Sequence, residues 1–247
     1  MANKAHTREA QARLRVYQAR TQVNAEQRAR RKRDNLLAIT SVTVVFALAI
    51  IGQVVYFGSG PGKPTPTASS ALSLPDSSLA EGRDWSGSAM VGSVPVQFTL
   101  NGALAPQAVS SEISLIRAGF YDNTTCHRLV TSGIYVLQCG DPKADGTGGP
   151  GYNYGPIENA PVDNFYPAGT IAMARTGNNA QSQGSQFFIV YQDSTIPADK
   201  VGGYTVVGRI TDGLAPLQEL IAGTQVEGGG TDGKPTVPIV LDNVTIQ

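Results

Sequence analysis

The chain has 247 residues with 19 Lys and Arg, 19 Asp and Glu, two Cys and two His, which excludes a disulfide-dense scaffold and leaves few ligands for a structural zinc site. The balanced charge hides an asymmetry, because residues 1–35 carry ten basic and three acidic side chains whereas residues 84–247 carry seven basic and fourteen acidic ones. The two parts of the chain are therefore expected to work in different surroundings.

The basic residues 1–35 form the first predicted segment. A basic run is one signature of nucleic-acid binding, but the apolar residues of this segment form no stripe and no aromatic side chains are interleaved to stack on bases. Such a run is more often a solvated topology signal that is attracted to anionic lipid. We expect a cytoplasmic segment and no nucleic-acid partner.

Residues 36–57 carry no charge over 22 positions. As a helix rising about 1.5 Å per residue they would span about 33 Å, enough to cross a bilayer core. A buried core helix is disfavoured by the basic run just before them, and a cleaved signal peptide by the length of the apolar run and of the leader that precedes it. We expect a single transmembrane helix that acts as a signal anchor, with the N-terminus in the cytoplasm and everything after Phe57 outside.

Residues 58–83 are rich in Gly, Pro and Ser, and residues 63–67 read Lys-Pro-Thr-Pro-Thr, which favours extended backbone. A segment of this composition cannot bury a core, so we expect a tether with no fixed structure over most of its length. Residues 84–247 then have the usual size of one domain.

Short alternating or β-branched runs, separated by Gly, Pro, Asn and Asp, predict strands in this domain. They lie at 85–90, 94–100, 125–130, 134–139, 169–174, 186–191, 204–209 and 237–246. Helices are predicted at 106–118, which opens with Pro and stops at Gly119, and at 216–222, which stops at Gly223. About eight short strands with two helices favour an all-β domain, a closed barrel with helices capping its ends.

Two common enzyme signatures fail in the domain. Residues 146–151 match G-x-G-x-x-G, but Pro150 makes a helix start implausible, so we expect a loop and not a nucleotide site. His127 is the only His of the domain, and no activated Ser or Cys lies near a base, so we expect His127 to make structural hydrogen bonds. We expect no cofactor and no metal.

Several short motifs occur in a fixed order along the domain. They read C-H-R-L-V at 126–130, Q-C-G-D-P at 138–142, G-G-P-G-Y at 148–152, G-T-I-A-M-A at 169–174, G-S-Q-F-F-I at 184–189 and Y-T-V-V-G-R at 204–209. In this order the domain resembles the cyclophilin family, in a membrane-anchored bacterial, actinobacterial-like form. The resemblance implies an eight-stranded antiparallel barrel with two helices and the activity of a peptidyl-prolyl cis–trans isomerase (EC 5.2.1.8).

The resemblance implies that Arg128 and Gln138 are the catalytic residues. An X–Pro bond rotates over a barrier of roughly 18–20 kcal/mol because rotation breaks amide resonance. The prolyl nitrogen regains a lone pair as the bond twists, so a donor aimed at it binds the twisted state better than either planar isomer. Arg128 can be that donor with a permanent charge. Gln138 is expected to orient either Arg128 or the substrate carbonyl.

The resemblance also implies a groove that binds the substrate chain. The expected binding residues are Tyr135, Val136, Phe188 and Ile196 around the proline ring, Tyr204 at the rim, Gln186 beside Phe188, and the backbone of Ala174 and Arg175 along the chain. The spacing between Arg128 and Gln138 is about two residues longer than the common family form. Ile134 therefore remains an alternative to Tyr135 and Val136 as the wall of the proline pocket.

Cys126 and Cys139 lie near the ends of two consecutive predicted strands that should pair antiparallel. If the turn closes around 131–134, the two residues face one another. A disulfide can persist outside the membrane, so we predict a bridge; two small buried thiols are the alternative.

The sequence thus predicts a membrane-tethered, extracytoplasmic prolyl isomerase that acts on proline-containing exported polypeptides. Its catalytic domain is expected to be monomeric. The competing hypothesis is a non-catalytic module that binds proline-containing chains as a scaffold or chaperone.

Overall fold

The computed structural model describes residues 72–247. The predicted cytoplasmic segment at 1–35, the predicted transmembrane helix at 36–57 and most of the predicted linker lie outside the described residues. Within 72–247, no helix combines the length and apolar character that a membrane crossing requires.

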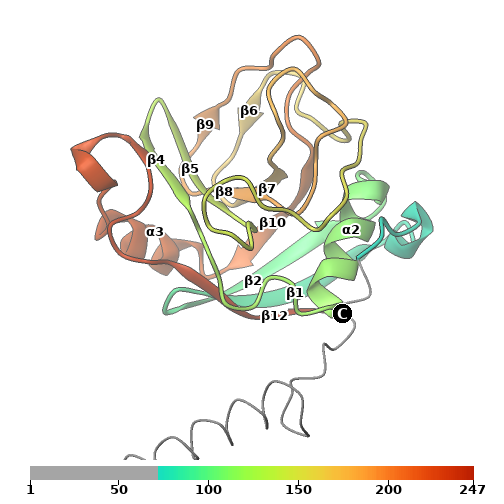
Figure 1. The fold of residues 1–247 in the computed structure, drawn as a ribbon, viewed down its shortest axis with the longest axis horizontal. Coiled ribbons are helices and arrows are strands. Elements are labelled where there is room, and N and C mark those ends of the chain that lie inside the picture. The colour runs from blue at the N-terminus through green and yellow to red at the C-terminus, as the bar shows by residue number, and fades with distance from the viewer. Residues whose placement is uncertain (1–71) are drawn as a thin grey trace, which may run out of the picture. The chain divides into compact units, whose positions relative to one another are not determined.

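Residues 72–247 form an all-β fold with two α-helices (Figure 1). The longer strands are β1 (Asp84–Val91), β2 (Val94–Asn101), β4 (Arg128–Ser132), β5 (Ile134–Cys139), β7 (Thr170–Met173), β8 (Phe187–Val190), β10 (Val206–Asp212) and β12 (Val240–Ile246). The two-residue strands are β3 (Thr124–Thr125), β6 (Phe165–Tyr166), β9 (Ser194–Thr195) and β11 (Asp232–Gly233). The predicted strands therefore recur with shifted ends, the one at 125–130 being divided between β3 and β4, and β6, β9 and β11 are additions.

Ten strands form one curled antiparallel sheet in the order β11-β4-β5-β8-β7-β10-β2-β1-β12-β3, and β6 pairs with β9 in a separate small sheet. The expected closed eight-stranded barrel is wrong, because the ladder has two open ends, at β11 and β3, and the sheet is a half-barrel. The single strand expected at 125–130 is also wrong, because it is interrupted between β3 and β4. Cys126 donates to the carbonyl of Ile239, whereas His127 donates to the carbonyl of Gln138, so the chain changes partner between β3 and β4.

The sheet has an apolar cluster on each face because its strands alternate. The concave side holds the main core, which includes Trp85, Val109, Ile113, Leu137 and Ile189. The other side carries a smaller cluster of Val130, Val136, Tyr166, Ala172, Phe188, Val190 and Ile196. Neighbouring residues of one strand, such as Leu137 and Val136, therefore enter different clusters.

Helices α2 (Pro106–Arg117) and α3 (Leu214–Ala222) lie at opposite ends of the sheet (Figure 1). Pro106 starts α2 at a position where its missing N–H costs nothing, and the helix buries Val109, Ile113 and Ile116. Helix α3 begins two residues before the predicted start, because Gly213 adopts φ 86° at its N-cap. A Cβ at Gly213 would also collide with the backbone of Pro95 and Val96, so this turn requires glycine.

The chain just before β1 is structured. The 3₁₀ turn η1 (Ser77–Ala80) packs on α2: the Ser110 hydroxyl accepts from the Ala80 amide at 2.9 Å and donates to the Ser77 carbonyl at 2.9 Å. The indole of Trp85 donates to the Ala80 carbonyl at 2.9 Å. These contacts join the end of the predicted tether to the domain core.

Candidate active site

A pocket of about 420 Å³ opens over the smaller apolar cluster. Its lining comes from alternate positions of three neighbouring strands and of the loops beside them. Ile134, Val136 and Gln138 come from β5, Phe188 from β8, and Arg128 from the start of β4. Because a strand turns every second residue to the same face, this alternation places a cation, an amide and apolar walls around one hollow.

Arg128 stands at the edge of this pocket in a network of three hydrogen bonds. Its Nε donates to Oδ1 of Asp232 at 2.7 Å and its Nη2 donates to Oδ2 of Asp232 at 2.7 Å. Its Nη1 donates to Oε1 of Gln138 at 3.2 Å. A guanidinium has five N–H groups, so two remain for another ligand.

Gln138 and Gln186 continue this network across the groove. The two strands pair Arg128 with Gln138 directly, and the Gln138 amide donates to Oε1 of Gln186 at 2.9 Å. The Gln186 amide donates in turn to the carbonyls of Gly146 and Gly148, at 3.0 and 2.9 Å. Both glutamines are therefore held in fixed orientations, and Gln138 contacts Arg128 as one of its two expected roles requires.

Asp232 is a site residue that sequence reasoning missed. It lies 104 residues after Arg128 and reaches it because β11 pairs with β4, where Asp232 is opposite Val130. The hydrogen bonds to Arg128 lower the pKa of Asp232, and the same bonds raise the pKa of Arg128. Both groups are therefore ionised at neutral pH. The sequence shows no acid near Arg128, and only the pairing of β11 with β4 brings this one in.

Apolar side chains form the remaining walls of the pocket, as expected for Val136, Phe188, Ile196 and Tyr204. Phe188 is 5% exposed, and its ring meets the ring of Tyr204 edge to face at 5.4 Å. The Tyr204 amide donates to the hydroxyl of Tyr166 at 2.9 Å, which fixes the rim. A hollow of this kind suits a small apolar ring.

Tyr135 does not line the pocket, so the role expected for it is wrong. It alternates with Ile134 and Val136, so its ring enters the opposite face and meets the ring of Tyr191 at 5.9 Å. Ile134 takes the place on the pocket wall. Adjacent residues of one strand cannot both face the same groove, so Tyr135 and Val136 are mutually exclusive as walls.

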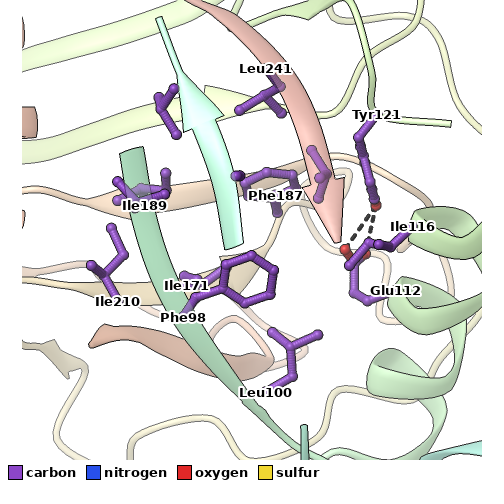
Figure 2. A pocket seen from close by; sticks show the side chains of 14 residues that line it. Phe98, Leu100, Glu112, Ile116, Tyr121, Ile171, Phe187, Ile189, Ile210 and Leu241 are labelled. Atoms are coloured by element: carbon purple, nitrogen blue, oxygen red, sulfur yellow. Dashed lines mark hydrogen bonds between the residues drawn. The ribbon is translucent and has the colours of Figure 1, made fainter. Parts of the chain in front are cut away.

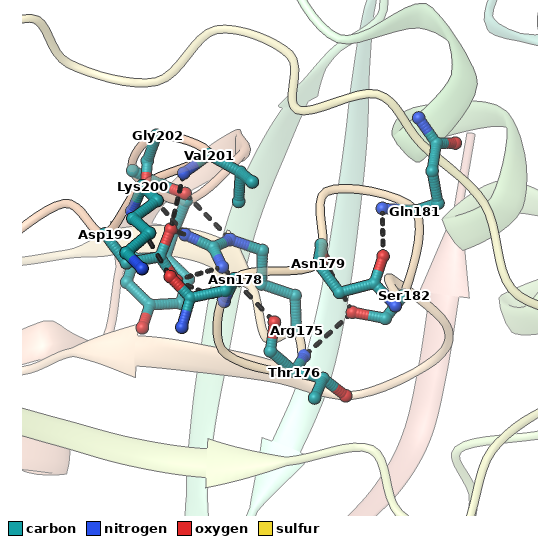
Figure 3. A network of polar contacts seen from close by, with 12 residues as sticks. Arg175, Thr176, Asn178, Asn179, Gln181, Ser182, Asp199, Lys200, Val201 and Gly202 are labelled. Atoms are coloured by element: carbon teal, nitrogen blue, oxygen red, sulfur yellow. Dashed lines mark hydrogen bonds and ion pairs between the residues drawn. The ribbon is translucent and has the colours of Figure 1, made fainter.

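Ala174 and Arg175 lie at the groove in different ways. Ala174 lines it, but its amide already donates to the Gln186 carbonyl at 2.8 Å. The Arg175 side chain is 1% exposed. Its Nη1 and Nη2 donate to the two carboxylate oxygens of Asp199 at 2.7 and 2.9 Å (Figure 3). Its Nε and Nη2 also donate to the carbonyls of Gly203 and Gly202. These bonds hold the pKa of Asp199 well below its usual range. The Arg175 guanidinium therefore fixes the loop beneath Tyr204, whose ring it approaches at 4.8 Å.

A second pocket, of about 270 Å³, adjoins the first and shares Gln138, Gly146, Ala174 and Arg175 with it. Its further lining is mostly backbone and small polar side chains, including Gly148, Gly149, Asn153, Thr176, Ser182 and Gln186. The Gly-rich run at 146–151 is thus a loop, as the sequence predicts, and it forms one wall of this second pocket. Together the two pockets make one groove along β5, β8 and the end of β7.

A disulfide joins Cys126 to Cys139 beside the groove. Both cysteines are fully buried in the main core. Cys126 lies between β3 and β4, two residues before Arg128, and Cys139 ends β5, one residue after Gln138. The bridge therefore links the two segments that position the cation and the amide.

His127 is buried in the lining of the first pocket, and burial lowers the pKa of its imidazole, which is neutral at pH 7. Neither ring nitrogen has a hydrogen-bond partner among residues 72–247, so the expected structural hydrogen bonds are absent from that part of the chain. A neutral, enclosed imidazole is a poor proton donor. The permanently charged group of this pocket is therefore Arg128 and not His127.

Comparisons with known proteins match this domain to one family. The model of the family described as cyclophilin type peptidyl-prolyl cis-trans isomerase matches residues 90–246. A probable peptidyl-prolyl cis-trans isomerase B of Mycobacterium tuberculosis is 47% identical over 156 residues, which cover 58% of this chain and 48% of that protein. A protein of the same description from Mycobacterium leprae is 45% identical over 159 residues, covering 60% of this chain and 52% of that protein. The chain thus matches about half the length of these relatives.

A shorter relative is matched over most of its length. The peptidyl-prolyl cis-trans isomerase B of Bacillus subtilis is 38% identical over 120 residues, which cover 48% of this chain and 78% of that protein. Among solved structures, a cyclophilin type isomerase of Cryptosporidium parvum superposes with a TM-score of 0.55 at 24% identity, covering 66% of this chain and 98% of that one. A second structure of that protein, determined in the presence of the dipeptide Ala-Pro, gives the same values. The structural likeness establishes the fold.

Proposed function

Because this chain belongs to the cyclophilin-type peptidyl-prolyl cis–trans isomerase family, we propose that its groove accelerates rotation about X–Pro bonds in exported polypeptides. The observation that carries the proposal is the position of Arg128 on the rim of a pocket walled by Phe188, Val136 and Ile196. The Arg128 guanidinium stays protonated at neutral pH and cannot act as an acid or base, and rotation about an X–Pro bond requires no proton transfer. The substrates are proline-containing polypeptides.

The proline ring fills the apolar pocket, and the carbonyl before it swings while the ring is held. At mid-rotation the imide nitrogen loses resonance with that carbonyl and carries a lone pair. Arg128 donates one of its two remaining N–H groups to this nitrogen, which stabilises the twisted state more than either planar isomer. Gln138 and Gln186 keep the guanidinium in register with the pocket through the bonds described above.

The direct test is the rate of cis–trans exchange in an Ala-Pro peptide, measured by NMR exchange spectroscopy with the full chain in a non-ionic detergent. Uncatalysed exchange takes on the order of tens to hundreds of seconds. We expect the wild-type chain to accelerate it and Arg128→Ala to lower the catalysed rate by roughly 10²–10³-fold, as for loss of other transition-state donors. A wild-type chain that binds the peptide without accelerating exchange would instead be a binding scaffold.

We also propose that the domain acts outside the cytoplasm while the chain is anchored in the cell membrane. The uncharged run at 36–57, with the basic residues before it, supports a single-pass anchor in the cell membrane with the isomerase domain outside the cytoplasm. The buried disulfide supports the same location, since such bonds persist in oxidising compartments and are rare in the cytosol. The proposed clients are therefore chains that fold after export.

A further inference from the structure

The segment 225–236 forms a closed loop that carries Asp232 to the groove. Its two arms are joined by hydrogen bonds from the Thr236 amide to the Gln225 carbonyl and from the Glu227 amide to the Lys234 carbonyl, each 2.8 Å long. The loop is then attached to the sheet, because β11 pairs with β4 and the Thr131 amide donates to the Thr231 carbonyl at 2.8 Å. The backbone at Asp232 is thus fixed relative to the backbone at Arg128.

The Asp232 side chain supplies the geometry that Arg128 otherwise lacks. An arginine has a long flexible stem, and its one contact in the groove besides Asp232, the 3.2 Å bond to Gln138, leaves the guanidinium free to rotate about that bond. Two parallel bonds of 2.7 Å to one carboxylate fix the plane of the group. They occupy the edge formed by Nε and Nη2, and together with the Gln138 bond on Nη1 they leave one N–H on each terminal nitrogen.

We propose that Asp232 is a positioning residue of the isomerase, which clamps the Nε edge of Arg128 so that its two remaining N–H groups are held ready for the twisted imide. The inference rests on the proposed function, because it assigns to Asp232 a part in that reaction. A donor held in place before the substrate arrives needs no reorganisation when the bond twists, and misplacement by 1 Å costs up to about 100-fold in rate.

A purely structural role for the pair is a weaker explanation. The Arg128 and Asp232 side chains are 41% and 50% exposed. Ion pairs this exposed add little to stability, since water screens them. Loss of Asp232 should therefore leave the fold intact while it frees Arg128 to move, which makes the substitution a clean probe.

The first test compares substitutions at Asp232 with a control on the same loop. We expect Asp232→Asn and Asp232→Ala in the full chain to lower kcat for the Ala-Pro peptide by about 10-fold or more, with KM changed by less than about 2-fold, because the lost interaction acts in the transition state. Asp232→Glu, which keeps the charge, should recover part of the rate. The matched control is Glu227→Gln, an exposed carboxylate of this loop that has no contact with Arg128 and should leave both constants unchanged.

The second test asks whether Asp232 acts through Arg128. The double variant Arg128→Ala/Asp232→Ala should be no slower than Arg128→Ala alone, because the clamp has nothing left to hold. Independently of activity, the Arg128 Nε–H should give a slowly exchanging NMR signal in the wild type that is lost in Asp232→Asn.

Unchanged or raised kcat in Asp232→Asn, with an active wild type, overturns the positioning role and leaves the proposed function standing. The positioning role is also overturned if Asp232→Ala slows the Arg128→Ala background further, or if the Nε–H signal survives in Asp232→Asn. A wild type that does not isomerise the peptide overturns both proposals, and the NMR signal then reports the ion pair alone.

Discussion

Glu112 is a carboxyl group enclosed by the main core. It lies on α2 and lines a cavity of about 50 Å³ together with Phe98, Ile171 and Leu241, and its oxygens are each 2.8 Å from the Tyr121 hydroxyl (Figure 2). Burial raises the pKa of Glu112 to about 8. No cation is paired with it among the described residues, so the acid is protonated at neutral pH.

This raised pKa predicts a pH dependence of stability. Between the ordinary value of 4.5 and about 8, the folded state keeps the proton and the unfolded state has lost it. Unfolding therefore releases a proton in this window, and the free energy of unfolding should fall as pH rises, by at most about 1.4 kcal/mol per pH unit from this group. Urea midpoints of the full chain at pH 5, 6.5 and 8 measure the slope.

The variant Glu112→Gln, which cannot ionise and keeps the shape, is the control for that slope. Its urea midpoint should vary less with pH than that of the wild type. The midpoint of Glu112→Gln should therefore exceed that of the wild type most at pH 8, and this excess should shrink or reverse at pH 5. Parallel profiles for the two chains would mean that Glu112 titrates normally in the fold.

The alternation of β5 shows what sequence can predict at the scale of an element. The period of two places Val136 and Gln138 on one face and Leu137 and Cys139 on the other, and the structure has this arrangement. The same period excludes Tyr135 from the groove, although motif position alone assigns it there. For β5, the alternation of the sequence is therefore enough to predict which side chains share a face.

The sequence could not predict which distant strands pair with one another. The two-residue strands β6, β9 and β11 have no alternation to detect, since they exist only because another segment lies beside them. Asp232 enters the site through β11, and the change of partner at Cys126 and His127 depends on β12. Arg128, Gln138 and Phe188 could be found from local motifs, whereas the acid that holds Arg128 could not.

The disulfide gives a prediction for the β4–β5 element. Its cysteines are 13 residues apart, and closing a loop of this length restricts the unfolded chain enough to stabilise the fold by about 3 kcal/mol. We expect Cys126→Ala/Cys139→Ala to lower the free energy of unfolding by about that amount, measured by urea titration of the full chain under non-reducing conditions.

Reduction provides a second measurement of the same bond. A dithiol reductant should lower the urea midpoint of the wild type and leave that of the double variant unchanged. Equal midpoints for oxidised wild type, reduced wild type and variant would show that the bridge contributes nothing to stability.

At the scale of the whole molecule, the uneven charge predicts where each part works. We expect the full chain to remain with membranes after high-salt and alkaline washes, because an apolar run of 22 residues binds far more strongly than a basic surface does. Deleting residues 36–57 should release the chain. Protease added to intact spheroplasts should degrade the isomerase domain, and its complete protection there would place the domain in the cytoplasm instead.

Strand β1 pairs with the chain's last strand, with Gly87 opposite Ile246, while the loop that carries Asp232 immediately precedes that strand. The earliest strand of the domain therefore has one unsatisfied edge until β12 has been made. Local segments can form earlier in synthesis, but the groove is complete only when β11 and β12 have been made, so we do not expect the proposed activity before that point.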